Sequence, residues 1–446
     1  MYRPDQPVSS EQPESVPPEE RRNGVSLVVE VSAGITTFLS MVYVLAVNPA
    51  ILKWSGMPES ALFTATALGT IFATLIMCFI ARLPFVVAPG MGLNAFFAFS
   101  VVGTMGFSWQ EALTAVFIAG IAFVLLSLSP LRQKILKEVP ESLQFAVAAG
   151  IGLMITYIGL KNGGLVVIRP DGNVTIGSLS SGVGLLTIIG VFVTGVFLAM
   201  NLRYSLLLGI IVTTVIGIPL GVTDISNVTL GSLVSTPPSV SEIAFKFDFS
   251  DLGNPQFWAV VFTFLFMCVF DTLAGFIGLF SVMGAEAERY KPRIEKAFIA
   301  DSLGVVAGAC VGLSPNTTYA ESGAGLAAGG RTGITAFTVA VLFALCLFLS
   351  NLFLLVPASA VAPALVLVGL LMLASVKNLD FSDKTESFPA FAVIALTCLT
   401  WRLSDSLAVG WILYIVMKVV GGKIGLITPT VWLVGLLFFI KEFFAS

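Results

Sequence analysis

Long apolar segments recur along almost the whole chain, and they constrain its fold more than any other feature. The hydrocarbon core of a bilayer is about 30 Å thick, so a helix needs about 20 apolar residues to cross it. Fourteen apolar segments lie near 27–47, 60–81, 85–103, 110–129, 141–160, 182–201, 203–221, 256–280, 295–313, 315–330, 332–355, 357–375, 387–401 and 405–420. A fifteenth, at 424–440, could be a further span or an interfacial helix. Together these segments predict an all-α polytopic membrane protein.

The low charge content and the absence of histidine exclude several classes of protein. Asp, Glu, Lys and Arg make up 11% of the 446 residues, and the chain has no His. So few charges could not cover a soluble domain, which argues against a cytosolic enzyme or a nucleic-acid-binding protein. The five cysteines stand alone in apolar runs, without the spacing of metal ligands. We therefore predict no metal, no cofactor and no enzymatic activity.

The distribution of Lys and Arg predicts the orientation of the chain, because cytoplasmic loops carry an excess of these residues. If the N-terminus is cytoplasmic, 18 of the 23 cations fall on the inner side. An even number of spans then places the C-terminus inside as well. Residues 1–24 are rich in Pro, Glu and Ser, which predicts a disordered cytoplasmic tail. We expect a multi-pass protein of the cell (inner or plasma) membrane.

A short internal sequence repeat suggests that the chain is built from two similar halves. TFLSM at 37–41 recurs as TFLFM at 263–267, 226 residues later. Seven spans in each half would give the halves inverted topology, as in many secondary transporters. Segments 88–97 (APGMGLNAFF) and 313–325 (LSPNTTYAESGAG) are poor helix formers at corresponding positions. Interrupted helices often line transporter sites, whereas simple kinks are the alternative interpretation.

Two carboxylates, Asp271 and Glu321, lie inside predicted spans. An ionisable residue within a span is a functional hypothesis by default, because an unpaired buried charge is costly. Either residue could bind a proton reversibly, which is the chemistry of a proton-coupled carrier. The alternative is a structural ion pair, for instance between Glu321 and Arg331 or Lys296.

Other charged residues are interpreted as structural. Arg402 and Asp405 are expected to form an i,i+3 ion pair at the membrane edge. Glu30 opens the first span and is expected to face the interface. The basic segment 289–296 is interpreted as a determinant of topology.

The candidate site residues gather in the two interrupted segments and in the eighth span. They are Asn94, Asp271, Asn316, Thr317, Thr318 and Glu321, with Phe96 and Phe97 beside them. This set offers hydrogen-bonding groups, a carboxylate and an aromatic face. A planar heterocycle with N–H donors fits, because its ring could stack on Phe while its N–H groups reach the carboxylate. An anion such as sulfate or phosphate would be repelled by Glu321.

The same segments resemble a known family. LPFVVAPGMGLNAFFAFSVV (83–102), AAGIGLMITYIGLKNGGLV (148–166), VFDTLAGFIG (269–278) and TTYAESGAGLAAGGRTGITA (317–336) resemble the AzgA-like purine nucleobase permeases. These form a branch of the nucleobase–ascorbate transporter superfamily, the xanthine/uracil/vitamin C permease family. The opening GITTFLSMVYVLAVNPAIL (34–52) agrees as well, so the resemblance covers about 25–420.

The resemblance implies about fourteen spans in a 7+7 inverted repeat, with core and gate domains. Spans 3 and 10 would each begin as a short strand and continue as a half-helix. The implied divisions are the tail (1–24), the first core half with spans 1–4 (25–130), the first gate half with spans 5–7 and an outside loop (131–255), the second core half with spans 8–11 (256–355), and the second gate half with spans 12–14 and the C-terminal apolar segment (356–446).

The implied function is import of adenine, guanine or hypoxanthine by proton symport and alternating access. Glu321 would bind the N–H edge of the base, assisted by the chain from Thr318 through Ala320 to Ser322, and Asp271 would take the coupling proton or orient the base. Asn94 would hold the meeting point of the half-helices, and Phe97 or Phe96 would stack on the base. Homodimers through the gate domain are also implied.

This chain departs from the family pattern at two places. Cys268 stands where the eighth span of the family carries a second Asp, which leaves coupling or the preferred purine open. The segment 401–405 (WRLSD) is charged where the family is uncharged. The alternatives are therefore a carrier of the same fold for a pyrimidine, ascorbate or a small anion, or an uncoupled facilitator.

Overall fold

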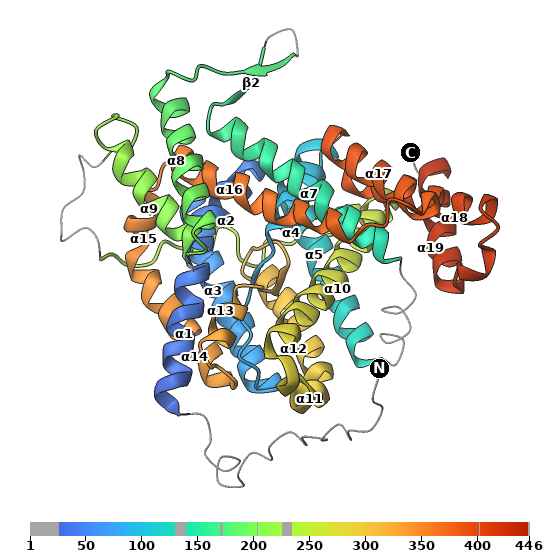
Figure 1. Ribbon diagram of the computed structural model, residues 1–446, viewed down its shortest axis with the longest axis horizontal. Coiled ribbons are helices and arrows are strands. Elements are labelled where there is room, and N and C mark those ends of the chain that lie inside the picture. The colour runs from blue at the N-terminus through green and yellow to red at the C-terminus, as the bar shows by residue number, and fades with distance from the viewer. Residues whose placement is uncertain are drawn as a thin grey trace, which may run out of the picture.

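The computed structural model describes residues 26–129, 140–169, 173–202, 204–224, 234–400 and 402–444. The predicted tail, 1–24, lies outside the described residues. Within them, nine helices are long and apolar enough to cross a membrane, and two shorter apolar helices span Met91–Thr104 and Ser205–Gly217. The chain is thus mostly helical (Figure 1), which confirms the predicted class, while the count of fourteen spans stays a prediction.

The helices follow the predicted apolar segments. The first half contains α1 (Leu27–Met41), α2 (Val44–Leu52), α3 (Glu59–Ile76), α4 (Met91–Ala95), α5 (Trp109–Leu128), α7 (Glu141–Asn162), α8 (Gly182–Ala199) and α9 (Ser205–Gly217). The second half contains α10 (Pro255–Met283), α11 (Ala287–Tyr290), α12 (Ile294–Cys310), α13 (Ser322–Ala327), α14 (Gly333–Cys346), α15 (Ser350–Leu354), α16 (Ala358–Leu373), α17 (Lys384–Thr400), α18 (Leu403–Val420) and α19 (Pro429–Phe444). Two π-helical segments, Met77–Ala81 and Phe96–Thr104, extend α3 and α4.

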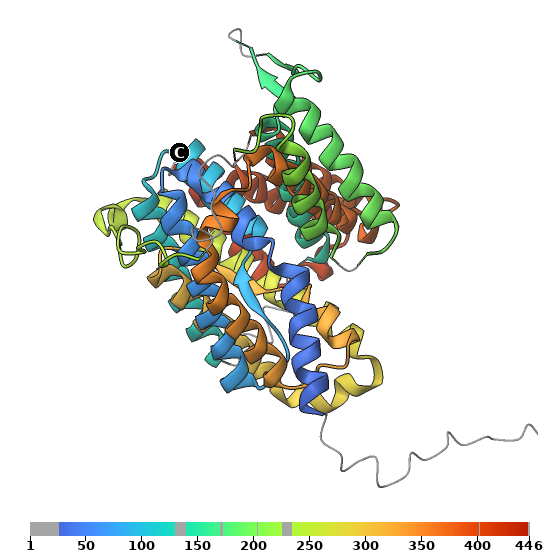
Figure 2. The same cartoon turned by 90° about the vertical axis from the view of Figure 1, so that its left-hand side faces the viewer.

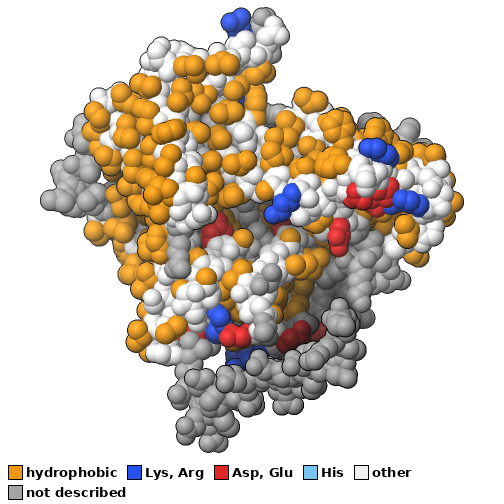
Figure 3. Space-filling view, viewed as in Figure 1, with side chains coloured by type: hydrophobic (Ala, Val, Ile, Leu, Met, Phe, Trp, Pro, Cys, Tyr) orange, Lys and Arg blue, Asp and Glu red, His pale blue; other side chains and the backbone are white. Residues whose placement is uncertain are grey.

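Two groups of helices are visible in the fold. α1, α3, α5, α12 and α14 pack in one bundle, and α7, α8, α9, α16 and α17 pack in another. Figure 2, turned by 90°, separates the two bundles most clearly. We call them the α3–α12 bundle and the α7–α16 bundle. Apolar side chains cover the outer face over α8, α9 and α16, and a recess with visible acidic side chains lies between the bundles (Figure 3).

Small residues allow close helix crossings within the second bundle. A Cβ on Gly152 of α7 would lie 2.6 Å from the carbonyl oxygen of Gly369 in α16. A Cβ on Gly369 would lie 2.4 Å from the carbonyl oxygen of Gly152. Neither position has room for a side chain. Glycine at such crossings lets backbones approach, which is how helices associate in a solvent that is itself apolar.

Two short strands lie at the places where the sequence predicted interrupted helices. β1 (Val87–Pro89) pairs antiparallel with β4 (Asn316–Thr318), Val87 opposite Thr318. Pro89 and Pro315 lack N–H groups, so neither segment can complete a helical ladder there. The pair is buried in the α3–α12 bundle, and its ends lead into α4 and towards α13. A second pair, β2 (Val166–Ile168) with β3 (Val174–Ile176), forms an exposed hairpin after α7.

Candidate functional site

Glu321 lies between β4 and α13. Its side chain is half-buried, and its Oε1 atom accepts a hydrogen bond of 2.7 Å from the hydroxyl of Tyr43, in the turn between α1 and α2. The alternative of a structural ion pair with Arg331 is not found, because the Arg331 guanidinium contacts Glu286 at 2.5 Å instead. In the described part of the chain, no cation forms an ion pair with Glu321.

A cavity of about 310 Å³ opens beside Glu321. One wall comes from α1 and α13, and the opposite wall comes from α8, α9, α16 and the turn between α8 and α9. The described lining residues are Ser40, Leu198, Asn201, Leu202, Tyr204, Ser205, Leu206, Glu321, Ala324 and Leu371. Small-molecule sites combine apolar walls with a few polar groups in this way, at volumes of about 300–1,000 Å³. The cavity therefore suits a small, partly polar molecule held between the two bundles.

Asp271 lies on α10, and its side chain is exposed. It does not belong to the described lining of the Glu321 cavity. One turn later, a Cβ on Gly275 would lie 3.0 Å from the carbonyl oxygen of Thr318, so α10 meets β4 at this glycine. Residues four apart share a helix face. Asp271 therefore projects from the face of α10 that meets the strand pair.

A third carboxylate, Asp301 of α12, was missed from the sequence. It is fully buried, and its Oδ1 atom accepts a hydrogen bond of 2.6 Å from the hydroxyl of Thr318, while Oδ2 accepts one from Thr272. An Asp inside an apolar helix is the same signal that identified Asp271, and it would have identified Asp301 in the segment 294–310. The carboxylate ties α10, α12 and β4 together.

Asn94 sits where the two strand-bearing segments meet. The residue is fully buried in α4; its Nδ2 atom donates to Asn48 of α2, and its Oδ1 atom accepts from the hydroxyl of Ser314. Asn48 in turn donates to the hydroxyl of Thr66 at 2.7 Å. The amide thus joins the two interrupted segments to α2 and α3, a position that fits its predicted role.

The predicted aromatic residues occupy the core. Phe96 and Phe97 have no exposed surface, and the ring of Phe96 packs edge-on against Phe264 with centroids 4.9 Å apart. Stacking on a substrate would require one of these rings to become exposed, so that role stays a prediction. Ser322 is also buried, and its hydroxyl accepts a hydrogen bond of 3.0 Å from the N–H of Val86.

The remaining candidates of the second interrupted segment differ in their surroundings. Ala320 is exposed. Asn316 is fully buried and donates to the carbonyl oxygen of Gly304 at 3.0 Å. The Asn316 Oδ1 and Thr317 Oγ1 atoms are buried, and neither has a hydrogen-bond partner among the described residues.

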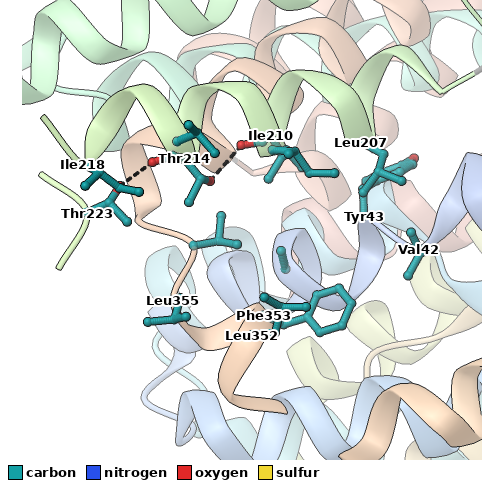
Figure 4. A pocket seen from close by; sticks show the side chains of 14 residues that line it. Val42, Tyr43, Leu207, Ile210, Thr214, Ile218, Thr223, Leu352, Phe353 and Leu355 are labelled. Atoms are coloured by element: carbon teal, nitrogen blue, oxygen red, sulfur yellow. Dashed lines mark hydrogen bonds between the residues drawn. The ribbon is translucent and has the colours of Figure 1, made fainter. Parts of the chain in front are cut away.

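A second cavity, of about 430 Å³, lies on the other side of Tyr43, between α2, α9, α15 and the chain directly after α15 (Figure 4). Its walls are almost entirely apolar, and the hydroxyls of Thr214 and Thr223 bond to backbone carbonyls of Ile210 and Thr214. Tyr43 therefore separates an apolar cavity from the carboxylate of Glu321.

The prediction that Glu30 faces the interface is wrong. Its side chain has no exposed surface and accepts hydrogen bonds from the N–H groups of Arg331 and Thr332, at 3.1 and 3.3 Å, and from the Thr335 hydroxyl at 2.5 Å. The carboxylate satisfies donors that have no partner within the start of α14. By contrast, the predicted Arg402–Asp405 ion pair is confirmed, at 3.2 Å.

Lys418, one of the 18 cations counted on the inner side, is buried in α18. Its ammonium group lies 2.5 Å from Glu386 and 3.8 Å from Asp383, and Glu386 also accepts a hydrogen bond from Ser142 of α7. Lys423 pairs with Asp383 at 2.7 Å, and this hydrogen bond lowers the pKa of the Asp383 carboxyl below its ordinary value. We call Asp383, Glu386, Lys418 and Lys423 the α17–α18 cluster.

The described residues include no group of three His, Cys, Asp or Glu side chains that could hold a metal ion. Cys268, at the position of the second family Asp, is a buried free thiol.

Comparison with known proteins identifies the family. Residues 29–406 match the xanthine/uracil permease model, whose description is "Permease family". The chain is 40% identical over 425 residues to adenine permease AdeP of Escherichia coli (strain K12), covering 95% of this chain and 94% of that protein. It is 39% identical to guanine/hypoxanthine permease PbuO of Bacillus subtilis (strain 168), covering 94% of this chain and 98% of that protein.

A solved structure shares the fold. The transmembrane domain of a cyanobacterial bicarbonate transporter, BicA, superposes with a TM-score of 0.61 at 16% identity, covering 86% of this chain and 97% of that domain. At this identity the similarity extends to the fold alone. The family match and the nine long apolar helices of the described residues make the chain a multi-pass membrane transporter rather than an enzyme. The chain belongs to the xanthine/uracil permease family.

Proposed function

We propose that this chain imports purine nucleobases, namely adenine, guanine or hypoxanthine, by proton symport. Relatives at 39–40% identity are named as adenine and guanine/hypoxanthine permeases, which supports the substrate class. The observation that carries the proposal is the cavity of about 310 Å³ beside Glu321, a carboxylate without a described counter-charge. A purine base presents N–H donors on its edge and an apolar face, which this combination of carboxylate and leucine walls would accept.

Glu321 would bind the N–H edge of the base. Tyr43 fixes one carboxylate oxygen, which orients the other towards a ligand. Ser40, Asn201 and Ser205 offer further hydrogen-bonding groups in the cavity, and the backbone from Thr318 to Ser322 would assist. Asn94 would keep the two interrupted segments in register through its bonds to Ser314 and Asn48.

Asp271 and Glu321 would carry the coupling proton. Both side chains have accessible surface, and Asp271 projects from the helix face that meets β4. A negative charge inside the membrane is costly, and protonation of a carboxylate would remove it. The carrier with a bound proton would therefore expose less charge to the membrane interior than the carrier without one. Asp301 would transmit the protonation state of Asp271 to Thr318, because its carboxylate accepts hydrogen bonds from Thr318 and from Thr272, the residue after Asp271.

Alternating access would come from movement of the α3–α12 bundle against the α7–α16 bundle. The proposal includes fourteen spans in a 7+7 inverted repeat, with core halves 25–130 and 256–355 and gate halves 131–255 and 356–446. The cavity between the bundles supports this division, because a site at such a boundary can open to either side. We further propose a cytoplasmic N-terminus and C-terminus in the cell membrane, and a homodimer through the gate domain.

The test is uptake of radiolabelled hypoxanthine and adenine by a host that lacks its own purine permeases, with and without a protonophore. Glu321→Gln keeps the shape but removes the charge, and it should abolish uptake. Glu59→Gln, at an exposed carboxylate paired with Lys53, is the matched control and should transport normally. Normal, gradient-dependent uptake by Glu321→Gln would refute the role of Glu321. Uptake without accumulation in the wild type would instead indicate an uncoupled facilitator, and no uptake of either base would indicate another solute.

A further inference from the structure

Three cations meet in a cavity at one end of the α3–α12 bundle, and this cavity shares no lining residue with the Glu321 cavity. The cavity has a volume of about 420 Å³, and its described lining is Phe79, Ile80, Ala81, Arg82, Arg293 and Lys296. No acidic side chain belongs to that lining. Within the described residues, none of the three cations forms an ion pair with a carboxylate. Such a concentration of positive charge is a site for an anion.

The local backbone builds this cavity from two distant segments. The π-helical extension of α3 ends at Arg82, whose φ of 54° turns the chain away from the helix. The Nη1 atom of Arg293 donates a hydrogen bond of 2.9 Å to the carbonyl oxygen of Arg82, which joins the end of α3 to the start of α12. Arg293 also lies over the ring of Tyr290, 5.3 Å from its centroid. The site is therefore fixed by backbone and aromatic contacts rather than by acidic partners.

An apolar surface adjoins the cations. Phe79 is 65% exposed and Ile80 is 37% exposed, so the same cavity presents large hydrophobic side chains to the surroundings. In a multi-pass membrane protein, a helix end at which apolar residues give way to Arg and Lys lies at the level of the lipid headgroups. A ligand with both a phosphate and hydrocarbon chains would use the whole surface: the phosphate would bind the cations, and the chains would pack against Phe79 and Ile80. Free phosphate would use the cations alone.

We propose that Arg82, Arg293 and Lys296 form a binding site for the phosphate of an anionic phospholipid, with its acyl chains against Phe79 and Ile80. Guanidinium groups bind phosphate oxygens bidentately, and basic pockets between membrane helices bind anionic headgroups. The bound lipid stabilises the joint between α3 and α12. These two helices also support the strand pair, because Thr74 of α3 hydrogen-bonds to Val87 and Asp301 of α12 to Thr318.

The test is lipid binding to the purified full chain in a neutral detergent, measured by native mass spectrometry during titration with phosphatidylglycerol or phosphatidylcholine. Arg82→Gln/Lys296→Gln removes two exposed cations without touching the Arg293 hydrogen bond. Each cation near an anionic lipid contributes about a factor of five, so the double variant should bind phosphatidylglycerol about 25-fold more weakly. Lys377→Gln/Lys384→Gln, at two exposed lysines elsewhere, is the matched control and should bind as the wild type does.

The melting temperature provides a second readout that does not depend on the variants. Phosphatidylglycerol should raise it more than phosphatidylcholine does in the wild type, and millimolar inorganic phosphate should not reproduce the increase. Equal effects of the two lipids would overturn the proposal, as would undiminished binding of phosphatidylglycerol by the Arg82→Gln/Lys296→Gln variant. Complete displacement of the lipid by inorganic phosphate would show that the site binds the free anion and would overturn the lipid assignment.

Discussion

The α17–α18 cluster makes a sharp prediction about stability, because it places a buried cation among membrane helices. Lys418→Met keeps the length of the side chain but removes the ammonium group that lies 2.5 Å from Glu386. The Lys418 side chain is 2% exposed and that of Glu386 is 26% exposed. Removing one partner of a buried pair costs about 3–5 kcal/mol, and the partial exposure of Glu386 places this change at the lower end, about 3 kcal/mol.

A double-mutant cycle separates the ion pair from simple packing. Lys418→Met/Glu386→Gln removes both charges, while the amide introduced at position 386 can still hydrogen-bond to Ser142. Because no uncompensated charge remains, the double variant should recover at least half of the stability lost in Lys418→Met. Lys423→Met is the matched control, since Lys423 is 41% exposed and such pairs contribute at most about 1 kcal/mol.

The assay is the thermal unfolding of purified protein in detergent, followed by the loss of monodisperse protein on heating. Lys418→Met should melt several degrees below the wild type, Lys423→Met within a degree or two of it, and the double variant in between. The reasoning is refuted if Lys418→Met is as stable as the wild type. It is also refuted if the losses of stability caused by Lys418→Met alone and by Glu386→Gln alone add up in the double variant, because the two charges would then be uncoupled.

Three further predictions concern helix packing, the α17–α18 cluster and the candidate site. Gly369→Val should destabilise the protein more than Gly195→Val, because a Cβ at 369 would lie 2.4 Å from the Gly152 carbonyl whereas Gly195 faces open space; melting temperatures of the two variants decide this. The stabilisation that Lys423 provides through Asp383, whose pKa is lowered in the folded state, is present above the unfolded pKa of about 3.9 and is lost as the pH falls. The difference in melting temperature between the wild type and Lys423→Met should therefore shrink below about pH 4, and a constant difference would contradict this. Asp301→Asn should reduce uptake of a nucleobase more than it reduces the amount of folded protein, and a parallel loss of both would make Asp301 purely structural.

The sequence predicted the parts of the fold that depend on local patterns. Apolar segment lengths located most of the helices, and the prolines and glycines of 88–97 and 313–325 marked irregular segments, at which the structure has two short strands. Those same strings identified the family that the comparisons confirm. The Arg402–Asp405 pair was predictable because its partners lie three residues apart on one helix.

What the sequence did not reveal depends on contacts between distant segments. Tyr43 binds Glu321 across 278 residues, and nothing in the local pattern around a tyrosine in an apolar run indicates such a partner. Glu30 looks like an interfacial residue because it begins a span, yet it is buried against the start of α14. Lys418 looks like a loop cation because it lies near a helix end, and only the packing of α7, α17 and α18 buries it.

The central claim is that Glu321, in the cavity between the two bundles, binds a purine base in a proton-driven importer. The most direct measurement is accumulation of radiolabelled hypoxanthine and adenine by the wild type and by Glu321→Gln, in a host without purine permeases, with and without a protonophore. The account predicts accumulation by the wild type that collapses with the protonophore, and none by Glu321→Gln at equal membrane abundance. Protonophore-sensitive accumulation by Glu321→Gln at the wild-type rate would contradict it.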